Sequence, residues 1–333
     1  AAIESRPWAQ ILSRYREPHH GRSLFELLVT AAPLLALWVL AWLACAFGFW
    51  WLSLLIAVPA GGFMVRLFII QHDCGHGSFF AHKWANDWVG RAIGVLTMTP
   101  YDFWRRMHAI HHSTSGNLDR RGHGDIDTLT VREYFALSRW GRLKYRLYRN
   151  PVVMFGVGPA YVFFLRHRLP FGLMRAGWRP WASTQATNAG IAALIVALLW
   201  FLGVQAVLLV HIPILLVAAS AGVWLFYVQH QFENTVWSGD GEWRFQKAAL
   251  LGSSFYDLPA ILRWLTGNIG IHHVHHANSR IPCYRLPGVL RDHPDLRAIG
   301  RVTLMQSIRC AGLKLWDENR QRLVSFRDAR SAR

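Results

Sequence analysis

Two long stretches of this 333-residue chain contain no aspartate, glutamate, lysine or arginine: residues 27–65 and residues 180–232. A helix that crosses a bilayer needs about 20 apolar residues, whereas a soluble helix of such length needs a polar face. The missing charge therefore argues against the buried core helices of a soluble protein. Each stretch has room for two spans joined as a hairpin. We expect spans near residues 25–46, 49–71, 184–204 and 206–229.

Cysteine is also scarce, since the chain has only four and none forms a Cys-x-x-Cys pair. This scarcity excludes a disulfide framework and a cysteine-rich iron–sulfur module. No glycine-rich flavin fingerprint and no fused haem domain are visible either. Any redox reaction of this chain must therefore draw its electrons from a separate carrier.

Acidic residues are few: the chain has 19 Asp and Glu but 36 Lys and Arg, which gives a formal net charge of +17. Almost all basic residues lie outside the expected spans. The positive-inside rule then places both termini and the central segment in the cytoplasm. This basic surface suits anionic lipid headgroups and an acidic protein partner. Nucleic acid is not expected as a partner, because no nucleic-acid-binding motif accompanies the charge.

Histidine, by contrast, is concentrated in three short clusters: HDCGH at 72–76, HAIHH at 108–112 and HHVHH at 272–276. On a helix, positions i, i+3 and i+4 share one face, so each cluster can aim its imidazoles at one point. So many imidazoles suggest more than one transition-metal ion. His230 ends the fourth expected span at the depth of His72 and is a ninth candidate. The candidate ligands are His72, His76, His108, His111, His112, His230, His272, His275 and His276.

The roles of two residues near the third cluster stay undecided from the sequence. Asn268 precedes His272 by four residues, so on a continuous helix it would share that face and could hold a metal-bound water. His273 lies between two candidate ligands, and in a compact turn it could replace His272. Carboxylates that could orient the imidazoles by accepting their other N–H are Asp73, Asp119, Asp125 and Asp127. Each of these is equally compatible with an ordinary turn or cap.

The donor set favours iron over zinc. Structural zinc takes four ligands, often with cysteine, and soluble di-iron proteins use Glu with Glu-x-x-His, which these clusters lack. Two irons with four or five imidazoles each would suit oxygen activation, whereas zinc would suit a membrane hydrolase. A metal transporter would place its ligands along the spans, yet only His211 lies in the middle of one.

The chain reads as a single domain, 1–333, whose polar parts, residues 72–183 and 230–333, form a cap over the histidines. Within it, residues 84–107 predict a half-embedded helix, residues 113–150 are polar and predicted to be cytoplasmic, and residues 151–165 predict an interfacial segment. The sequence carries no signal of an oligomeric state.

The three clusters and their neighbours resemble the membrane fatty acid desaturase superfamily, which also contains hydroxylases and carotenoid ketolases. The resemblance rests on HDCGH followed by Gly77-Ser78-Phe79-Phe80, on HAIHH, and on HHVHH followed by Ile281-Pro282. It covers about Phe25 to about Leu290 and is strongest toward the acyl-lipid, omega-type branch of bacteria and plastids. It implies an all-α integral membrane fold, with four spans and a cytosolic helical cap that holds a di-iron site.

The resemblance also implies an activity. The chain would be an O2-dependent acyl-lipid desaturase of the bacterial inner membrane that inserts a cis double bond, with the nine histidines above as ligands of two Fe ions. Its substrate would be a membrane lipid or another acyl group, and its electron donor a separate ferredoxin with its reductase. A hydroxylase or ketolase that acts on a hydrophobic substrate is the alternative on the same scaffold.

Overall fold

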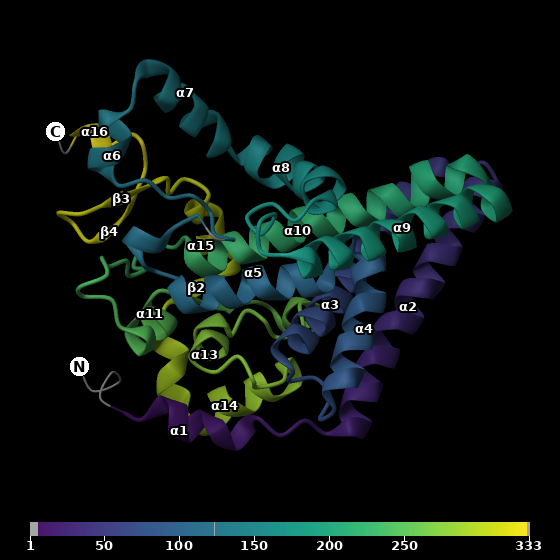
Figure 1. Ribbon diagram of the computed structural model, residues 1–333, viewed down its shortest axis with the longest axis horizontal. Coiled ribbons are helices and arrows are strands. Elements are labelled where there is room, and N and C mark those ends of the chain that lie inside the picture. The colour runs from purple at the N-terminus through teal and green to yellow at the C-terminus, as the bar shows by residue number, and fades with distance from the viewer. Residues whose placement is uncertain (1–5, 123, 332–333) are drawn as a thin grey trace.

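The computed structural model describes residues 6–122 and 124–331, and most of them are helical. Two long helices, α2 (His20–Ala46) and α3 (Trp50–His76), pack against each other as a hairpin (Figure 1). The turn between them places Gly48 in the left-handed region, with a φ of 86°, which glycine adopts without a steric penalty. The first expected hairpin is therefore present as packed helices.

A second hairpin follows from the other uncharged run. Its arms are α9 (Trp178–Gln205) and α10 (Ile212–His230), joined through the π-helical turn η6 (Ala206–His211). The backbone leaves the helical region at Gly203, where φ is 81° and ψ is 173°, and the chain reverses there (Figure 1).

Hydrogen bonds place the tips of both hairpins together. Trp42 Nε1 donates to the carbonyl of Leu202 at 3.5 Å, and Ser53 Oγ donates to that of Leu209 at 2.9 Å. By length and composition, three helical segments in the described part of the chain are apolar enough to cross a membrane: α2, α3 and the continuous segment Trp178–His230. The third segment contains the reversal at Gly203, so it holds two antiparallel arms.

The helix ends differ from the sequence-based expectation at the histidine side. Helix α2 begins at His20, five residues early, because the His19 imidazole accepts the backbone N–H of Arg22 as an N-cap. Helix α3 does not end at residue 71 but continues to His76, and Gly77 terminates it with a φ of 67°. The first histidine cluster therefore belongs to the helix rather than to the segment after it.

A buried ion pair joins the two helices of the first hairpin just outside its uncharged run. Glu26 on α2 pairs with Arg66 on α3, and both side chains are almost fully buried. Arg66 Nε also donates to Thr30 Oγ1 at 3.0 Å, and its guanidinium lies 4.1 Å from the ring centroid of Trp264. Because removing either partner would strand a buried charge, this pair fixes how α2, α3 and α12 (Ala260–Leu265) meet.

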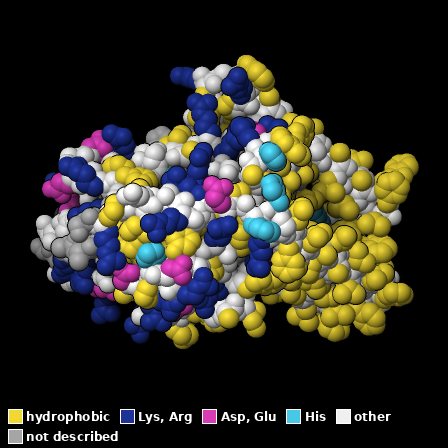
Figure 2. All heavy atoms as spheres, turned by 90° about the horizontal axis from the view of Figure 1, so that it is seen from below, with side chains coloured by type: hydrophobic (Ala, Val, Ile, Leu, Met, Phe, Trp, Pro, Cys, Tyr) yellow, Lys and Arg dark blue, Asp and Glu magenta, His cyan; other side chains and the backbone are white. Residues whose placement is uncertain are grey.

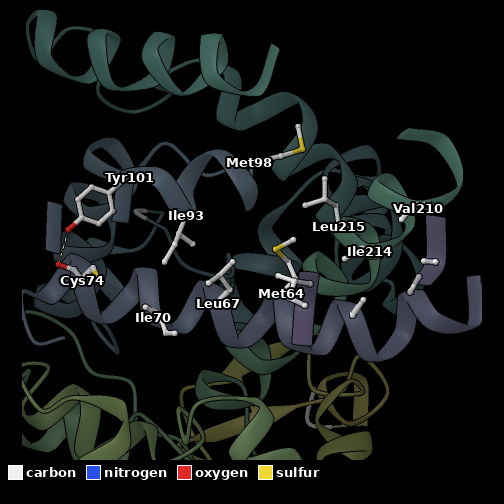
Figure 3. Packing of buried hydrophobic residues seen from close by; sticks show 14 of the residues in the cluster. Met64, Leu67, Ile70, Cys74, Ile93, Met98, Tyr101, Val210, Ile214 and Leu215 are labelled. Carbon is white, nitrogen blue, oxygen red and sulfur yellow. Dashed lines mark hydrogen bonds between the residues drawn. The ribbon is translucent and has the colours of Figure 1, made fainter. Parts of the chain in front are cut away.

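The region predicted as one half-embedded helix forms two. These are α4 (Lys83–Leu96) and α5 (Tyr101–Thr114), with a break at residues 97–100 where Pro100 precedes α5. Tyr101 OH donates to the carbonyl of Cys74 at 2.7 Å (Figure 3). Figure 3 also shows α3 residues such as Met64 and Leu67 packed against α4 and the second hairpin. This core holds α5, with its histidines, beside the end of α3.

The packing of α4 on α5 predicts that one added methyl group lowers the stability of the fold. A Cβ at Gly90 would lie 2.2 Å from Tyr101 Cε2, so Gly90→Ala forces the ring or the helix to move. We expect a loss of about 1–3 kcal/mol in stability, measured as a lower midpoint of thermal unfolding in detergent. Gly156→Ala is the matched control, because its Cβ would meet nothing within 4 Å. Equal midpoints for both variants would contradict the packing.

The rest of the chain forms a polar half, where most charged side chains gather, opposite the apolar hairpins (Figure 2). Among the described residues it contains four short strands: β1 (Phe255–Asp257) pairs in parallel with β2 (Arg301–Thr303), and β3 (Leu315–Asp317) pairs antiparallel with β4 (Arg322–Val324). The all-α prediction is wrong in this detail, because three-residue strands are too short to leave an alternating pattern. Further elements are α1 (Trp8–Leu12), η1 (Ser13–Tyr15), η2 (Leu118–Arg120), α6 (Val131–Ala136), α7 (Arg139–Tyr148), η3 (Val153–Val157), α8 (Gly158–Ala160), η4 (Tyr161–Leu165), η5 (Arg166–Arg168), α11 (Phe245–Leu251), α13 (His272–Ala277), η7 (Cys283–Arg285), α14 (Leu286–Asp292), η8 (Pro294–Ala298), α15 (Leu304–Cys310) and α16 (Asp328–Ser331).

Candidate metal centre

Helices α3 and α5 present histidines from facing sides. On α3, His72 and His76 are one helical turn apart, and their Nε2 atoms lie 3.3 Å from each other. On α5, His108 and His112 repeat this spacing, with 3.1 Å between their Nε2 atoms. The i, i+4 geometry of a helix puts each pair on one face, and the core around Tyr101 turns these two faces together.

The third cluster enters from the polar half. Helix α13 is only six residues long, and the histidines in it are buried. His275 Nε2 lies 3.2 Å from His112 Nε2, and His272 Nε2 lies 3.0 Å from His230 Nε2 at the end of α10. His230 Nε2 lies 3.2 Å from His111 Nε2. The structure therefore brings together all nine imidazoles that the sequence singled out.

The nine imidazoles divide into two neighbouring groups. Five offer ligand nitrogens within 4.8 Å of one another: His72, His76, His108, His112 and His275. A second group, within the same distance, consists of His111, His230 and His276, and His272 joins it through its contact with His230. Helix α5 contributes to both groups, because the His111 ring lies 5.6 Å from those of His108 and His112 between centroids while its Nε2 faces that of His230. Cys74 lies in neither group.

The spacing of the nitrogens fits metal ligation. Ligands about 2.0–2.1 Å from a shared ion stand roughly 3 Å apart at right angles, and the Nε2 pairs above are separated by 3.0–3.3 Å. His276 Nε2 is buried and has no hydrogen-bond partner in the described part of the chain. Imidazole nitrogens that face one another at this spacing, one of them without a hydrogen-bond partner, are suited to bind two ions.

The protonation state also suits ligation. Burial lowers the pKa of His112 and His276 well below the usual value, and neighbouring imidazoles lower it further. The pKa values of His108 and His275 are lowered for the same reasons. These imidazoles are therefore neutral at physiological pH, which is the form that binds a transition metal.

Two of the predicted carboxylates lie against histidine Nδ1 atoms. Asp73 Oδ1 is 3.2 Å from His72 Nδ1, while its Oδ2 accepts the backbone N–H of Cys283 at 2.6 Å. Asp125 Oδ1 makes a short contact with His111 Nδ1. Asp119 instead accepts the N–H of Asp240. Asp127 donates its backbone N–H to Tyr148 OH at 3.0 Å, and within the described ranges its side chain contacts no histidine.

This arrangement predicts different effects for two neighbouring aspartates. Asp125→Asn should weaken metal binding by about 10–100-fold, because the Nδ1–H of His111 would lose its negatively charged acceptor. Metal content after dialysis against a graded chelator series measures the change. Asp127→Asn is the matched control and should hold its metal like the unmodified protein. Equal retention by both variants would remove Asp125 from the supporting set.

Two expectations about the third cluster are resolved geometrically. Asn268 does not share a helix with His272, because Gly267 and Asn268 both adopt positive φ values, 56° and 59°, in a turn before α13. Its side-chain amide donates to the carbonyl of Cys283 at 3.2 Å, so the helical premise for a water-holding role is wrong. His273 Nε2 lies 3.0 Å from the carbonyl of Leu296, away from the group that His272 joins.

A cavity of about 430 Å³ opens beside the histidines. His72, His108, His111 and His272 form part of its wall, and the remainder is mainly apolar. Phe103 and Trp104 line it, and the Trp104 ring stacks on His108 with 4.6 Å between centroids. Phe79 and Phe80 pack in the core instead.

Helix α10 supplies a wall of the cavity that the histidine motifs do not predict. Phe226 packs against the rings of His111 and His230, with 5.1 Å between centroids in each case. Ala218, Ala219 and Gly222 continue this wall toward the hairpin tip. Phe226 lies one helical turn before His230, so its position on the histidine face could have been read from the spacing.

Comparison with known proteins identifies the family. A family model described as fatty acid desaturase matches residues 49–304. A fatty acid desaturase of Bacillus subtilis is 46% identical over 316 residues, which cover 95% of this chain and 89% of that protein. An sn-1 acyl-lipid omega-3 desaturase (ferredoxin) of Synechocystis is 29% identical over 232 residues, 66% of this chain and 61% of that protein. An sn-1 oleoyl-lipid 12-desaturase of Anabaena variabilis is 25% identical over 264 residues, 71% of this chain and 67% of that protein. The chain belongs to the fatty acid desaturase family.

Proposed function

We propose that this chain is an O2-dependent acyl-lipid desaturase that inserts a cis double bond into a fatty acyl chain. One observation carries the proposal: two groups of imidazoles converge, and members of both groups line a mainly apolar cavity of about 430 Å³. Methylene C–H bonds are inert to side-chain acids and bases, so their cleavage needs a redox-active cofactor beside a hydrophobic binding site.

Two iron ions are the cofactor that this donor set fits. One ion would be held by His72, His76, His108, His112 and His275, and the other by His111, His230, His272 and His276. When bound, the iron pair supplies the oxidising power that O2 brings to an unactivated C–H bond. Asp73 and Asp125 orient the imidazoles of His72 and His111 by accepting their Nδ1 protons.

The protein's own part in the reaction is positioning. The apolar wall from α3, α5 and α10 excludes water and holds one pair of methylenes near the histidines. Trp104 and Phe226 pack on ligand imidazoles, so they limit where the acyl chain can lie relative to the metal ligands. A fixed carbon pair is what a single double-bond position requires.

The membrane arrangement follows from the two hairpins. We propose four crossings, by α2, α3, α9 and α10, in the inner membrane of a bacterium. Both termini and the polar half lie on the cytoplasmic side, since the basic residues gather there and are absent from the hairpin tips. The histidines then lie at the cytoplasmic ends of the spans, where a soluble electron carrier can reach them.

The electron donor is proposed to be a separate ferredoxin with its reductase. The Synechocystis relative carries ferredoxin in its name, and an acidic carrier complements the net charge of +17. Salt should weaken this association, because screening shortens the reach of surface charges.

Mass spectrometry of total lipids tests the function. A bacterium that expresses this chain should accumulate acyl chains lighter by two hydrogens, and derivatisation locates the double bond. The same strain with the His111→Ala variant should show no such product. A gain of one oxygen would instead establish the hydroxylase or ketolase alternative. Unchanged acyl chains, despite protein that carries two irons and is supplied with reduced ferredoxin, would reject the proposal.

A further inference from the structure

One segment on the outside of the molecule is not explained by the metal centre. It runs from Arg139 to Arg168 through α7, η3, α8, η4 and η5, and we name it the lateral arm. Figure 1 shows α7 and α8 along one side of the molecule, with α8 reaching α10. The first part of the arm falls in the segment that the sequence placed in the cytoplasm as polar.

Helix α7 turns a hydrophobic face outward. Trp140, Leu143 and Leu147 follow the i, i+3, i+7 spacing of one helix face, and all three are exposed, Trp140 to 75%. The opposite face is buried, with Tyr145 and Arg149 directed inward. A soluble helix places its apolar face toward the core, so the orientation of α7 indicates an apolar or interfacial environment outside.

The same outer face continues through the rest of the arm. Val152, Val157, Tyr161 and Leu165 are all exposed, Val152 to 73%. Their spacing of five, four and four residues fits the wide turns of the π-helical segments η3 and η4, since a π turn holds more residues than an α turn. The arm therefore presents one apolar stripe along its whole length.

The inner face of the arm is a wall of the cavity beside the histidines. Met154, Pro159, Val162 and Phe163 line that cavity from the arm side, opposite residues of α3 and α5. The arm is thus apolar on both faces, and it separates the cavity from the outside of the molecule.

Contacts with α10 fix the depth of the arm. Phe155 packs against Trp224 and Tyr227, with ring centroids 4.9 Å and 5.1 Å apart. Arg149 donates to Gln231 Oε1 at 2.9 Å. Trp224, Tyr227 and Gln231 are close to His230 in the sequence. The arm therefore lies at the histidine end of the hairpins, where the proposed spans leave the bilayer.

The charge of the arm is of one sign. It holds seven basic residues and no acidic residue, and no Asp or Glu occurs anywhere between Glu133 and Glu233. Arg139 and Lys144 border the apolar face of α7, and Arg166 stands at the far end of the arm on the cavity wall. Basic side chains that flank an apolar stripe are typical of helices that lie in an anionic membrane interface.

We propose that the lateral arm lies in the headgroup region of an anionic bilayer. It then forms the wall past which a phospholipid acyl chain moves sideways from the bilayer into the cavity. The acyl-lipid substrate of the proposed function then reaches the cavity while it remains in the bilayer. The inference about substrate entry rests on the proposed function, whereas the position of the arm in the bilayer does not.

Spin-label depth measurements test the position of the arm without any activity. The four native cysteines are buried, so nitroxides attached to Leu147→Cys and Val157→Cys report on the arm in phosphatidylglycerol–phosphatidylethanolamine vesicles. Both labels should collide more with O2 than with a water-soluble nickel chelate. Trp200→Cys in α9, exposed to 81%, is the membrane control, and Arg132→Cys in α6 is the aqueous control. Arm labels that match Arg132→Cys would overturn the proposal.

A pair of outer-face substitutions tests substrate entry. Val157→Asp with Tyr161→Asp puts two carboxylates into the stripe, away from the cavity. Turnover of phospholipid in anionic vesicles should fall by about tenfold or more, because charge opposes insertion at the interface. Turnover of a short-chain phospholipid in detergent should stay within roughly twofold, since no bilayer has to be entered. Equal losses in both assays, or no loss in either, would overturn the entry route.

The two failures are distinguishable. If the unmodified protein desaturates no lipid in either assay, the proposed function is wrong, and the spin labels still decide where the arm lies. If it desaturates a thioester in solution but not vesicle phospholipid, the chain is still a desaturase, but the acyl-lipid substrate and the entry route are both rejected.

Discussion

Replacing His111 by alanine is expected to abolish desaturation, with a loss of at least about a thousandfold, and to remove one of the two irons that we propose. His111 Nε2 lies 3.2 Å from His230 Nε2 and belongs to the smaller group of imidazoles. That group retains only three imidazoles without it. Lipid mass spectrometry measures the activity, and elemental analysis of the purified protein measures the iron.

The third cluster supplies a demanding control for this prediction. His272 and His273 are adjacent and both buried, yet only His272 points at another histidine. His272→Ala should lose iron in the same way, whereas His273→Gln should retain it, because glutamine can still donate to the carbonyl of Leu296. Full activity and full iron in His111→Ala would remove that residue from the ligand set. Iron loss in His273→Gln but not in His272→Ala would make His273 the ligand in place of His272.

The cavity gives a second prediction of large effect, at Gly222 on α10. A Cβ there would meet nothing within 4 Å, and the residue lines the cavity. It lies eight residues before His230, which is about 12 Å along a helix. Gly222→Leu should therefore fill the cavity beyond the reacting carbons without touching the metal ligands.

We expect Gly222→Leu to keep its iron but to lower desaturation of long acyl chains by about tenfold or more, because a bulky side chain excludes methylenes from a fixed volume. The remaining product should shift toward shorter chains. Gas chromatography of fatty acid esters measures both effects. Gly241→Leu, at an exposed turn position with open space around its Cβ, is the matched control. An unchanged chain-length profile in Gly222→Leu would show that the acyl chain does not pass this point.

Helical spacing made much of the candidate site predictable. The i, i+3 and i+4 positions of HDCGH and HAIHH fix which imidazoles share a face, and the family assignment that these motifs suggested is confirmed by the matching family model and relatives. His230 could be placed because it ends an uncharged run at the depth of His72. The convergence of segments so distant in the chain, however, is a tertiary property that no local pattern encodes.

The errors have equally specific causes. Asn268 was placed on a helix by counting back from His272, although the Gly267-Asn268 pair is a turn signal, since both residue types tolerate a positive φ. The strands of the polar half are too short to show a period of two. In α7, the basic residues between Trp140, Leu143 and Leu147 concealed an apolar face, because composition averages over the two sides of a helix.

The separation of the histidines along the chain bears on how the protein is made. His272 follows His76 by 196 positions, and at about 5–20 residues per second its synthesis comes roughly 10–40 s later. During that interval the first hairpin can already be inserted while its histidines lack their partners from α10 and α13. The full set of candidate ligands exists only after both hairpins have formed and α13 has packed against them. The proposed iron pair would therefore be acquired last, by a nearly complete chain, and a ribosome-bound fragment that ends before α13 would lack part of the ligand set.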